Sequence, residues 1–207
     1  DLVYIDNDFP IYAFRGNNPK IFISSGTHSP EWTQIFANLN FLKDTDSSVV
    51  SIPCINPFGL MRYPKRDKSN RMWGKYKDKR TKAISEYLSQ FDFSISIDMH
   101  EDVDFNEAYC YERKQKNDKS LADRLLTIPR TKETNIYGDE CNNGIINSDV
   151  KEKTLEYYMY KDTRKKQGAK YSLTIEIPGL QPELIRINQG KQILDNLKDQ
   201  IISYSGL

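Results

Sequence analysis

Histidine is scarce in this sequence: only two occur among 207 residues, His28 and His100. Cysteine is scarce as well. The three cysteines, Cys54, Cys110 and Cys141, have a spacing that fits neither a disulfide framework nor a metal-binding cysteine pair. A disulfide-stapled scaffold and a cysteine-based zinc module are therefore excluded. This use of cysteine favours a reducing compartment such as the cytoplasm.

The chain also lacks a strong charge of either sign and a long apolar run. Thirty Lys and Arg residues against 29 Asp and Glu residues leave a formal net charge of +1. A protein that binds a polyanion needs a basic excess to neutralise phosphates, so nucleic acid is not expected as a partner. No apolar stretch approaches the length that spans a bilayer, so no membrane partner is expected either.

Short β-prone runs alternate with helical patterns along the chain. Strands are expected at residues 1–10 (an edge strand or arm), 11–14, 20–25, 49–55, 93–99, 108–111 and 170–177, and helices at 30–43, 83–88, 120–126 and from about 189 onward. The first of these helices is indicated by apolar residues at spacings of three and four, namely Trp32, Ile35, Phe36, Leu39 and Leu42. Residues 131–147 read as a loop, and residues 150–160 as a helix or a tyrosine-rich loop. Strand, helix and strand in this order predict a right-handed parallel pair.

His28 and Glu31 follow a buried strand, in the stretch GTHSPEW. The carboxyl ends of strands in an open α/β sheet are where ligands usually bind. A His-x-x-Glu pair can supply an imidazole nitrogen and a carboxylate to one metal ion, and zinc accepts this mixture. A turn histidine before a helix start is the alternative, and the pair alone leaves both open.

His100 also ends a strand, FSISIDM, and is followed by Glu101. Three protein ligands with one open position are typical of catalytic zinc, and His28, Glu31 and His100 would supply them. A general base must then take a proton from the metal-activated water. Glu176, a lone carboxylate inside the strand YSLTIEI, is the first candidate, and Glu101 competes with it. A solvated position on the strand is the alternative for Glu176.

Residues 60–80 form a basic segment without a clear period. Its candidate groups for binding a substrate carboxylate or an oxyanion are Arg62, Arg66, Asn70 and Arg71. A solvated basic loop is the alternative, because several lysines share the segment. Tyrosines at positions 157, 158 and 160 offer a mobile hydrogen-bond donor, although tyrosines in such a run usually pack.

The ordered set of motifs resembles the zinc metallocarboxypeptidases of the carboxypeptidase A type, a grouping that extends to aspartoacylase and succinylglutamate desuccinylase. GTHSPEW is similar to the family's Gly-x-His-x-x-Glu, INPFG to its Asn-Pro-Asp/Asn-Gly turn, and KYSLTIEIPG to its Tyr-Ser-x-Thr-x-Glu strand. The matches run from Ile21 to Gly179. Only 68 residues separate Glu31 from His100, which favours a compact microbial branch near the desuccinylase and aspartoacylase enzymes.

The resemblance implies a role for each matching residue. His28, Glu31 and His100 would bind one Zn²⁺ ion, with Glu176 as the general base. Asn70 and Arg71 would grip the substrate's terminal carboxylate, and Arg66 would polarise the scissile carbonyl, with Arg62 in reserve. The family usually has an acidic residue two positions before the Asn-Arg pair, where this chain has Lys68, and SNRMW also fits a different Asn-Arg-x-Trp stretch of the family. The phenolic donor cannot be aligned, so Tyr158 is a candidate with Tyr157, Tyr160 and Tyr137.

Together these observations predict one zinc-carboxypeptidase-like catalytic domain over residues 1–207. Its expected fold is α/β: a mixed, mostly parallel twisted sheet with helices on both faces. Its expected activity is zinc-dependent hydrolysis of an amide bond next to a substrate carboxylate, as in a metallocarboxypeptidase that acts on peptides. An N-acyl amino acid deacylase and a non-catalytic binding domain that keeps the fold are the two alternatives.

Overall fold

The structure is a computed structural model that describes residues 1–6, 8–45, 48–61, 73, 78–131, 141–147, 155–161 and 169–204. Its strands are β1 (Leu2–Asp6), β2 (Phe9–Tyr12), β3 (Phe14–Arg15), β4 (Ile21–Ser25), β5 (Val49–Ile52), β6 (Ile95–Asp102), β7 (Tyr109–Arg113), β8 (Ile145–Asn147) and β9 (Tyr171–Pro178). Its helices are α1 (Thr33–Lys43), α2 (Pro57–Met61), α3 (Lys79–Leu88), α4 (Ala122–Leu125), α5 (Leu155–Lys161) and α6 (Glu183–Tyr204). None of the helices in these ranges combines the length and apolar character that crossing a bilayer requires.

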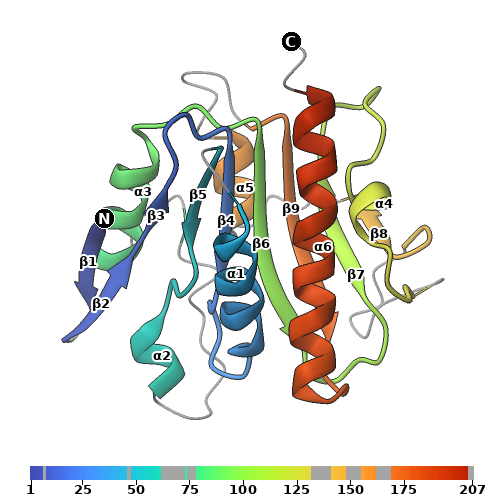
Figure 1. The fold of residues 1–207 in the computed structure, drawn as a ribbon, viewed down its shortest axis with the longest axis horizontal. Helices are drawn as coiled ribbons and strands as arrows, with labels where there is room; N and C mark the ends of the chain where they lie inside the picture. Colours follow the sequence, from blue (N-terminus) through green and yellow to red (C-terminus); the bar gives the residue numbers. More distant parts are fainter. Residues whose placement is uncertain are drawn as a thin grey trace.

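A seven-stranded sheet organises the fold, in the order β3-β5-β4-β6-β9-β7-β8 (Figure 1). The four strands β5, β4, β6 and β9 run parallel to one another, whereas β3 pairs antiparallel with β5, and β7 pairs antiparallel with β9. β1 and β2 form a separate antiparallel hairpin. The mixed, mostly parallel sheet predicted from the sequence is therefore confirmed.

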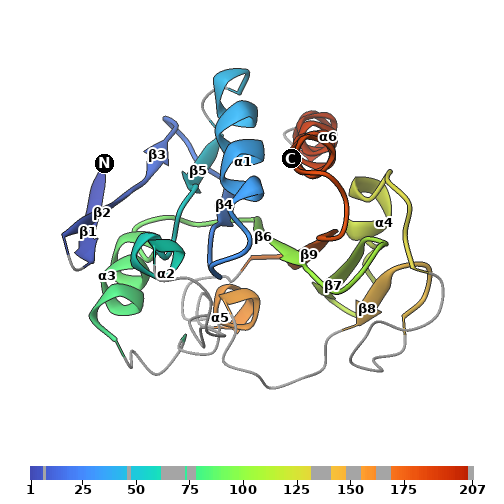
Figure 2. The same ribbon diagram turned by 90° about the horizontal axis from the view of Figure 1, so that it is seen from below.

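Helices cover both faces of this sheet. α1 and α6 lie side by side on one face, and α3 and α5 lie on the other (Figure 2). Each face has its own apolar core, because β4, β6 and β9 are buried on both sides and send alternate side chains to opposite faces. Polar residues on the α5 face of these strands are thus enclosed by protein rather than exposed.

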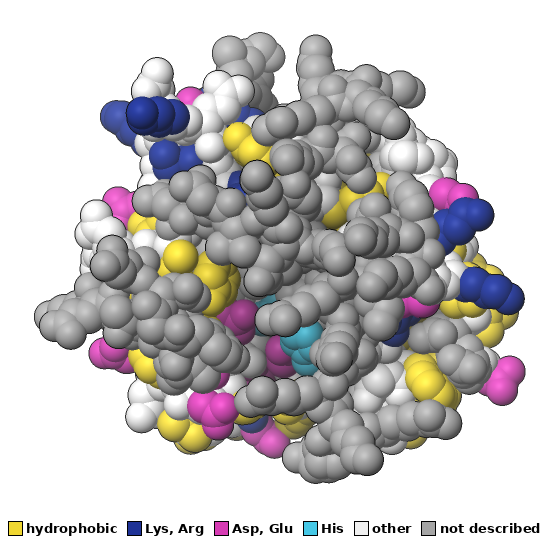
Figure 3. Space-filling view, turned by 180° about the vertical axis from the view of Figure 1, so that it is seen from behind, with side chains coloured by type: hydrophobic (Ala, Val, Ile, Leu, Met, Phe, Trp, Pro, Cys, Tyr) yellow, Lys and Arg dark blue, Asp and Glu magenta, His cyan; other side chains and the backbone are white. Residues whose placement is uncertain are grey.

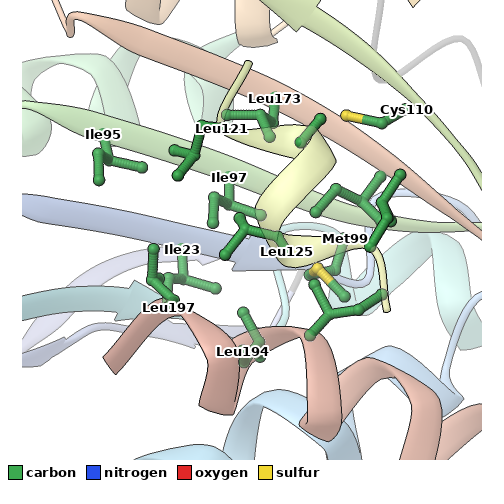
Figure 4. Packing of buried hydrophobic residues seen from close by; sticks show 14 of the residues in the cluster. Ile23, Ile95, Ile97, Met99, Cys110, Leu121, Leu125, Leu173, Leu194 and Leu197 are labelled. Carbon is green, nitrogen blue, oxygen red and sulfur yellow. The ribbon is translucent and has the colours of Figure 1, made fainter. Parts of the chain in front are cut away.

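The first core lies between the sheet and the pair of helices α4 and α6. Figure 4 shows Ile23, Ile97, Met99 and Leu173 from the strands against Leu194 and Leu197 from α6. The second core lies on the α3 and α5 face and includes Phe22, Val50, Ile84, Trp73, Leu155, Tyr158 and Met159. The strands that end at the candidate site are therefore held from both sides.

The predicted apolar face of α1 is wrong. The residues that α1 buries are Thr33, Gln34, Ala37, Asn38 and Phe41, whereas Phe36 is 49% exposed. The inward side chain of Asn38 is satisfied by hydrogen bonds, since it donates to Ser25 Oγ and accepts from Ser51 Oγ. Hydrogen bonding rather than the apolar period decides which face of this helix turns inward.

Other boundaries also differ from the prediction. Where single strands were expected at residues 1–10 and 11–14, the structure has the hairpin of β1 and β2 followed by the short edge strand β3. β8 lies in the segment 131–147, which was expected to be a loop. α1 begins at Thr33, so Pro30 lies in a turn before the helix instead of in its first turn. α6 begins at Glu183, earlier than the apolar period from Gln189 indicated. The period does not include the first turn because Leu184 and Ile185, its apolar residues, are exposed.

Candidate metal centre

The loop between β4 and α1 brings the first two candidate ligands to the carboxyl edge of the sheet. Gly26 begins the loop with a φ of 65°, a left-handed conformation that favours glycine. A Cβ atom at this position would lie 2.9 Å from Ile35 Cδ1, so the close approach of the loop to α1 also requires glycine. The buried Asn56 side chain donates to the carbonyl of Thr27 over 3.0 Å and fixes the backbone next to His28.

His28, Glu31 and His100 converge at this edge. Glu31 Oε1 lies 2.6 Å from His28 Nδ1, and Glu31 Oε2 lies 3.0 Å from His100 Nδ1. One potential ligand atom from each residue lies within 4.8 Å of the others, and the two imidazole rings are 5.0 Å apart between centroids. Three residues from two separate segments of the sequence thus direct their donor atoms at one small volume.

Asp98 orients the imidazole of His100. Asp98 Oδ2 lies 2.7 Å from His100 Nε2, and Ser24 Oγ donates to Asp98 Oδ1 over 2.7 Å. All three side chains are almost completely buried. A carboxylate on Nε2 leaves Nδ1 directed at Glu31, and this arrangement behind a histidine is typical of metal sites.

Glu176 stands beside His100. The two residues are register partners in the parallel pair of β6 and β9, so their side chains project from the same face of the sheet. On its other side Glu176 pairs with Tyr109 of β7, whose hydroxyl donates to Asp102 Oδ2 over 2.6 Å. Of the two carboxylates considered as general base, Glu176 is therefore the one that shares a face with His100.

The protonation of this cluster is set by burial and by mutual charge. Burial raises the pKa of Glu176 to about 8, and the carboxylates of Glu31, Asp102 and Asp98 add to the rise while His100 opposes it. Burial would also raise the pKa of Glu31, but the two histidines outweigh it and lower that pKa to about 2. The Glu31 carboxylate is therefore ionised at neutral pH, the form in which a carboxylate binds a metal ion.

The donor set fits a metal ion. Two imidazole nitrogens and one carboxylate match the protein ligands of a catalytic zinc. In the structure the Glu31 carboxylate contacts both Nδ1 atoms, so the donors already point to a common place. Among the described residues, these three form the group of His, Cys, Asp and Glu side chains that could hold a metal ion.

The three candidate ligands differ in their exposure to solvent. The His28 side chain is 27% exposed, whereas those of Glu31 and His100 are 5% and 1% exposed. Figure 3 shows histidine and acidic side chains visible together on the face seen from behind. Among the three candidate ligands, His28 is therefore the one that solvent contacts most.

The substrate-binding residues predicted from the basic segment, Arg62, Arg66, Asn70 and Arg71, lie outside the described residues, as does Tyr137. Tyr158 is buried in the second core, with its ring centroid 6.0 Å from that of Trp73. Tyr160 donates to the carbonyl of Lys114 over 3.2 Å. These contacts give both tyrosines packing or structural partners, and their role as a mobile donor stays a prediction.

Comparison with solved structures finds proteins of the same architecture at low sequence identity. A presumed metallopeptidase from Shewanella denitrificans OS217 has a TM-score of 0.78 and 21% identity over 95% of this chain and 81% of its own. One from Shewanella amazonensis SB2B has a TM-score of 0.77 and 17% identity, covering 95% and 84%. A metallo-carboxypeptidase from Burkholderia cenocepacia has a TM-score of 0.67 and 12% identity, covering 94% and 61%. The chain has a carboxypeptidase-like fold.

At such identities the likeness establishes the fold alone. Family models and curated proteins gave no match to this sequence. The branch near succinylglutamate desuccinylase, expected from the short sequence separation of Glu31 and His100, is not confirmed by these structural neighbours.

Reasoning from the sequence assigned no role to the residues behind the candidate ligands. Asp98 shares a strand face with His100 at a spacing of two, so the alternation of FSISIDM could have indicated its contact. Ser24 and Tyr109 carry no comparable signal, because their contacts with Asp98 and Asp102 depend on which strands are neighbours in the sheet.

Proposed function

We propose that this protein is a zinc-dependent hydrolase that cleaves an amide bond next to a substrate carboxylate, as a metallocarboxypeptidase does. One observation carries the proposal: the donor atoms of His28, Glu31 and His100 converge within 4.8 Å, and Glu176 is the register partner of His100 on the next strand. A catalytic metal needs three protein ligands and a nearby base, and these four residues meet that requirement.

His28, Glu31 and His100 would hold the ion, and Asp98 would keep His100 Nδ1 unprotonated by engaging Nε2–H. When bound, a zinc ion at this place would act as a Lewis acid towards water and towards the scissile carbonyl. The substrate would approach from the exposed side of His28.

Glu176 would act as the general base and then as the general acid. Its carboxylate takes a proton from the attacking water and passes that proton to the nitrogen that leaves. Without a cation its pKa is about 8, so the group is largely protonated near neutral pH. A positive charge nearby favours the ionised form, so cation binding would convert Glu176 into a base at neutral pH.

Substrate recognition is proposed from the sequence resemblance. Asn70 and Arg71 would bind the substrate carboxylate, and Arg66, with Arg62 in reserve, would stabilise negative charge on the carbonyl oxygen. Tyr158 stays the candidate phenolic donor. The carboxypeptidase-like fold supports a peptide with a free carboxyl terminus as the substrate.

A substrate panel tests the proposal. The zinc-loaded protein should release the last residue from peptides with a free carboxyl terminus, and peptides with an amidated terminus should be poor substrates. N-acyl amino acids serve as the comparison set. Hydrolysis that does not depend on zinc, or full activity of Glu176→Gln, would overturn the mechanism.

A further inference from the structure

Glu101 follows His100 directly, but its side chain projects from the opposite face of β6. The carboxylate is completely buried, with a side-chain exposure of 0%. Burial raises the pKa of this group, while hydrogen bonds from Thr33 and the charge of Arg186 oppose the rise. A carboxylate enclosed so fully requires several donors, and the structure supplies three of them.

Two of those donors belong to Thr33, the first residue of α1. Glu101 Oε1 accepts from the backbone N–H of Thr33 over 3.0 Å and also from its hydroxyl. Trp32, the residue before the helix, has no capping side chain. Glu101 therefore caps α1 from a neighbouring strand, and the negative charge lies at the helix end that favours it.

The third donor comes from α6. Arg186 Nη1 donates to Glu101 Oε2, and the Arg186 carbonyl accepts from Gln34 Nε2 over 3.4 Å. The Gln34 amide also donates to Thr33 Oγ1 over 3.1 Å. Three elements, β6, α1 and α6, are thus joined at one carboxylate.

We propose that Glu101 is a positioning residue that sets the separation of Glu31 and His100. Thr33 is two residues after Glu31, and Glu101 is one residue after His100, so their hydrogen bonds connect the two ligand-bearing segments directly beside the ligands. Metal sites tolerate displacements of only about 0.5 Å, so a contact this close to both ligands controls affinity. The inference rests on the metal site of the proposed function.

A buried carboxylate can also stabilise the fold without any effect on the site, and the chain contains a matched example of that case. Glu112 on β7 is buried, and its Oε1 accepts from the N–H groups of Leu121 and Ala122 at the start of α4. Glu112 pairs with Leu173, three residues before Glu176 on β9, so it lies about 10 Å along the strand from the site. Glutamine would keep an acceptor oxygen at Oε1, so Glu112→Met, which removes both oxygens but keeps the length of the side chain, is the control for loss of a helix cap alone.

The experiment measures two quantities for each variant: the zinc dissociation constant, by calorimetric competition with a chelator, and the thermal midpoint of the metal-free protein. Glu101→Gln puts an amide donor against Thr33 or Arg186, and we expect zinc affinity to fall about tenfold or more. Thr33→Val removes one hydroxyl and should give a smaller loss of affinity. Glu112→Met should lower the midpoint but leave the dissociation constant unchanged.

Each outcome decides the inference. Loss of zinc affinity in the Glu101 and Thr33 variants, with the Glu112 variant at the wild-type value, supports positioning. Wild-type affinity in both of those variants, or an equal loss in Glu112→Met, overturns it while leaving the metal site intact. If Glu101→Gln does not fold, Thr33→Val decides. If the wild-type protein binds no zinc, the proposed function fails, and the inference falls with it.

Discussion

His100 and Glu176 lie side by side as register partners on β6 and β9, with both side chains on the face of the sheet that α5 covers. His100 is one of three side chains that point their donor atoms at a common place, and Glu176 is a buried carboxylate next to it. A metal ligand and a base on adjacent strands cannot move independently. The hydrolytic proposal depends on this relationship.

Substitution Glu176→Gln removes the base but keeps the size of the side chain. We expect the turnover number to fall about 10²- to 10⁴-fold, the range that general acid–base catalysis usually supplies. Zinc content should stay at the wild-type level, because Glu176 is not among the three converging ligands. Steady-state kinetics on a cleaved peptide and metal analysis of the same preparation check both expectations. A variant that retains full activity would contradict the role.

Zinc affinity should rise with pH between about pH 6 and pH 8. In the metal-free protein, burial lowers the pKa of His100, but the charges of Glu31 and Asp98 outweigh it and raise that pKa well above its usual value. Burial raises the pKa of Glu176 to about 8. Below these pKa values His100 carries a proton that must leave before the ring can bind a metal, and Glu176 carries a proton that a nearby cation disfavours. Each proton released on binding makes the zinc affinity about tenfold stronger per pH unit. Chelator competition at three pH values measures the slope, and a flat profile would contradict this assignment.

Asp98→Asn should weaken zinc binding about 10- to 100-fold, the usual effect of changing the partner behind a metal-binding histidine. The amide cannot replace the ionised carboxylate that contacts His100 Nε2. Ser24→Ala removes only the hydroxyl that donates to Asp98, and it should cost less than Asp98→Asn. Comparing the zinc dissociation constants of the two variants tests whether Ser24 acts on His100 only through Asp98. A larger loss of affinity in Ser24→Ala than in Asp98→Asn would contradict this arrangement.

Gly190→Ala should destabilise the fold even though alanine favours helices by about 1 kcal/mol. A Cβ atom on Gly190 would lie 2.1 Å from Gln34 Oε1 and 2.9 Å from Ala37 Cβ, where α6 crosses α1. Overpacking of this kind costs about 1–3 kcal/mol, so the net change is expected to be a loss. Urea unfolding measures the change in the free energy of unfolding, and the dependence of that free energy on urea concentration should be unchanged. The second substitution Gln34→Ala should restore part of the stability.

The central strands could be predicted from the sequence because their residues are buried on both faces. IFISS, FSISIDM and KYSLTIEI are β-prone, and all three form strands that meet in the sheet. Sequence spacing could not show that β9 pairs with β6, because strands far apart in the sequence meet through the topology of the sheet. The position of Glu176 beside His100 therefore required the structure.

The inward face of α1 could not be predicted for a different reason. Gln34 and Asn38 are polar but completely buried, because α6, β4 and β5 supply their hydrogen-bond partners. Apolar periodicity assumes that polar residues face water, and here tertiary hydrogen bonds override it. Glu101 was considered as a base because it is next to His100 in the sequence. Consecutive residues of a strand point to opposite faces, so its side chain lies on the other face of β6.

Zinc content after extensive dialysis tests the account most directly. Wild-type protein should retain about one zinc ion per chain, and Glu31→Ala should retain far less, because the carboxylate that joins His28 and His100 is removed. The fold of the variant is checked by circular dichroism. A wild-type chain without zinc, or a folded Glu31→Ala variant that holds as much zinc as the wild type, would contradict the metal centre.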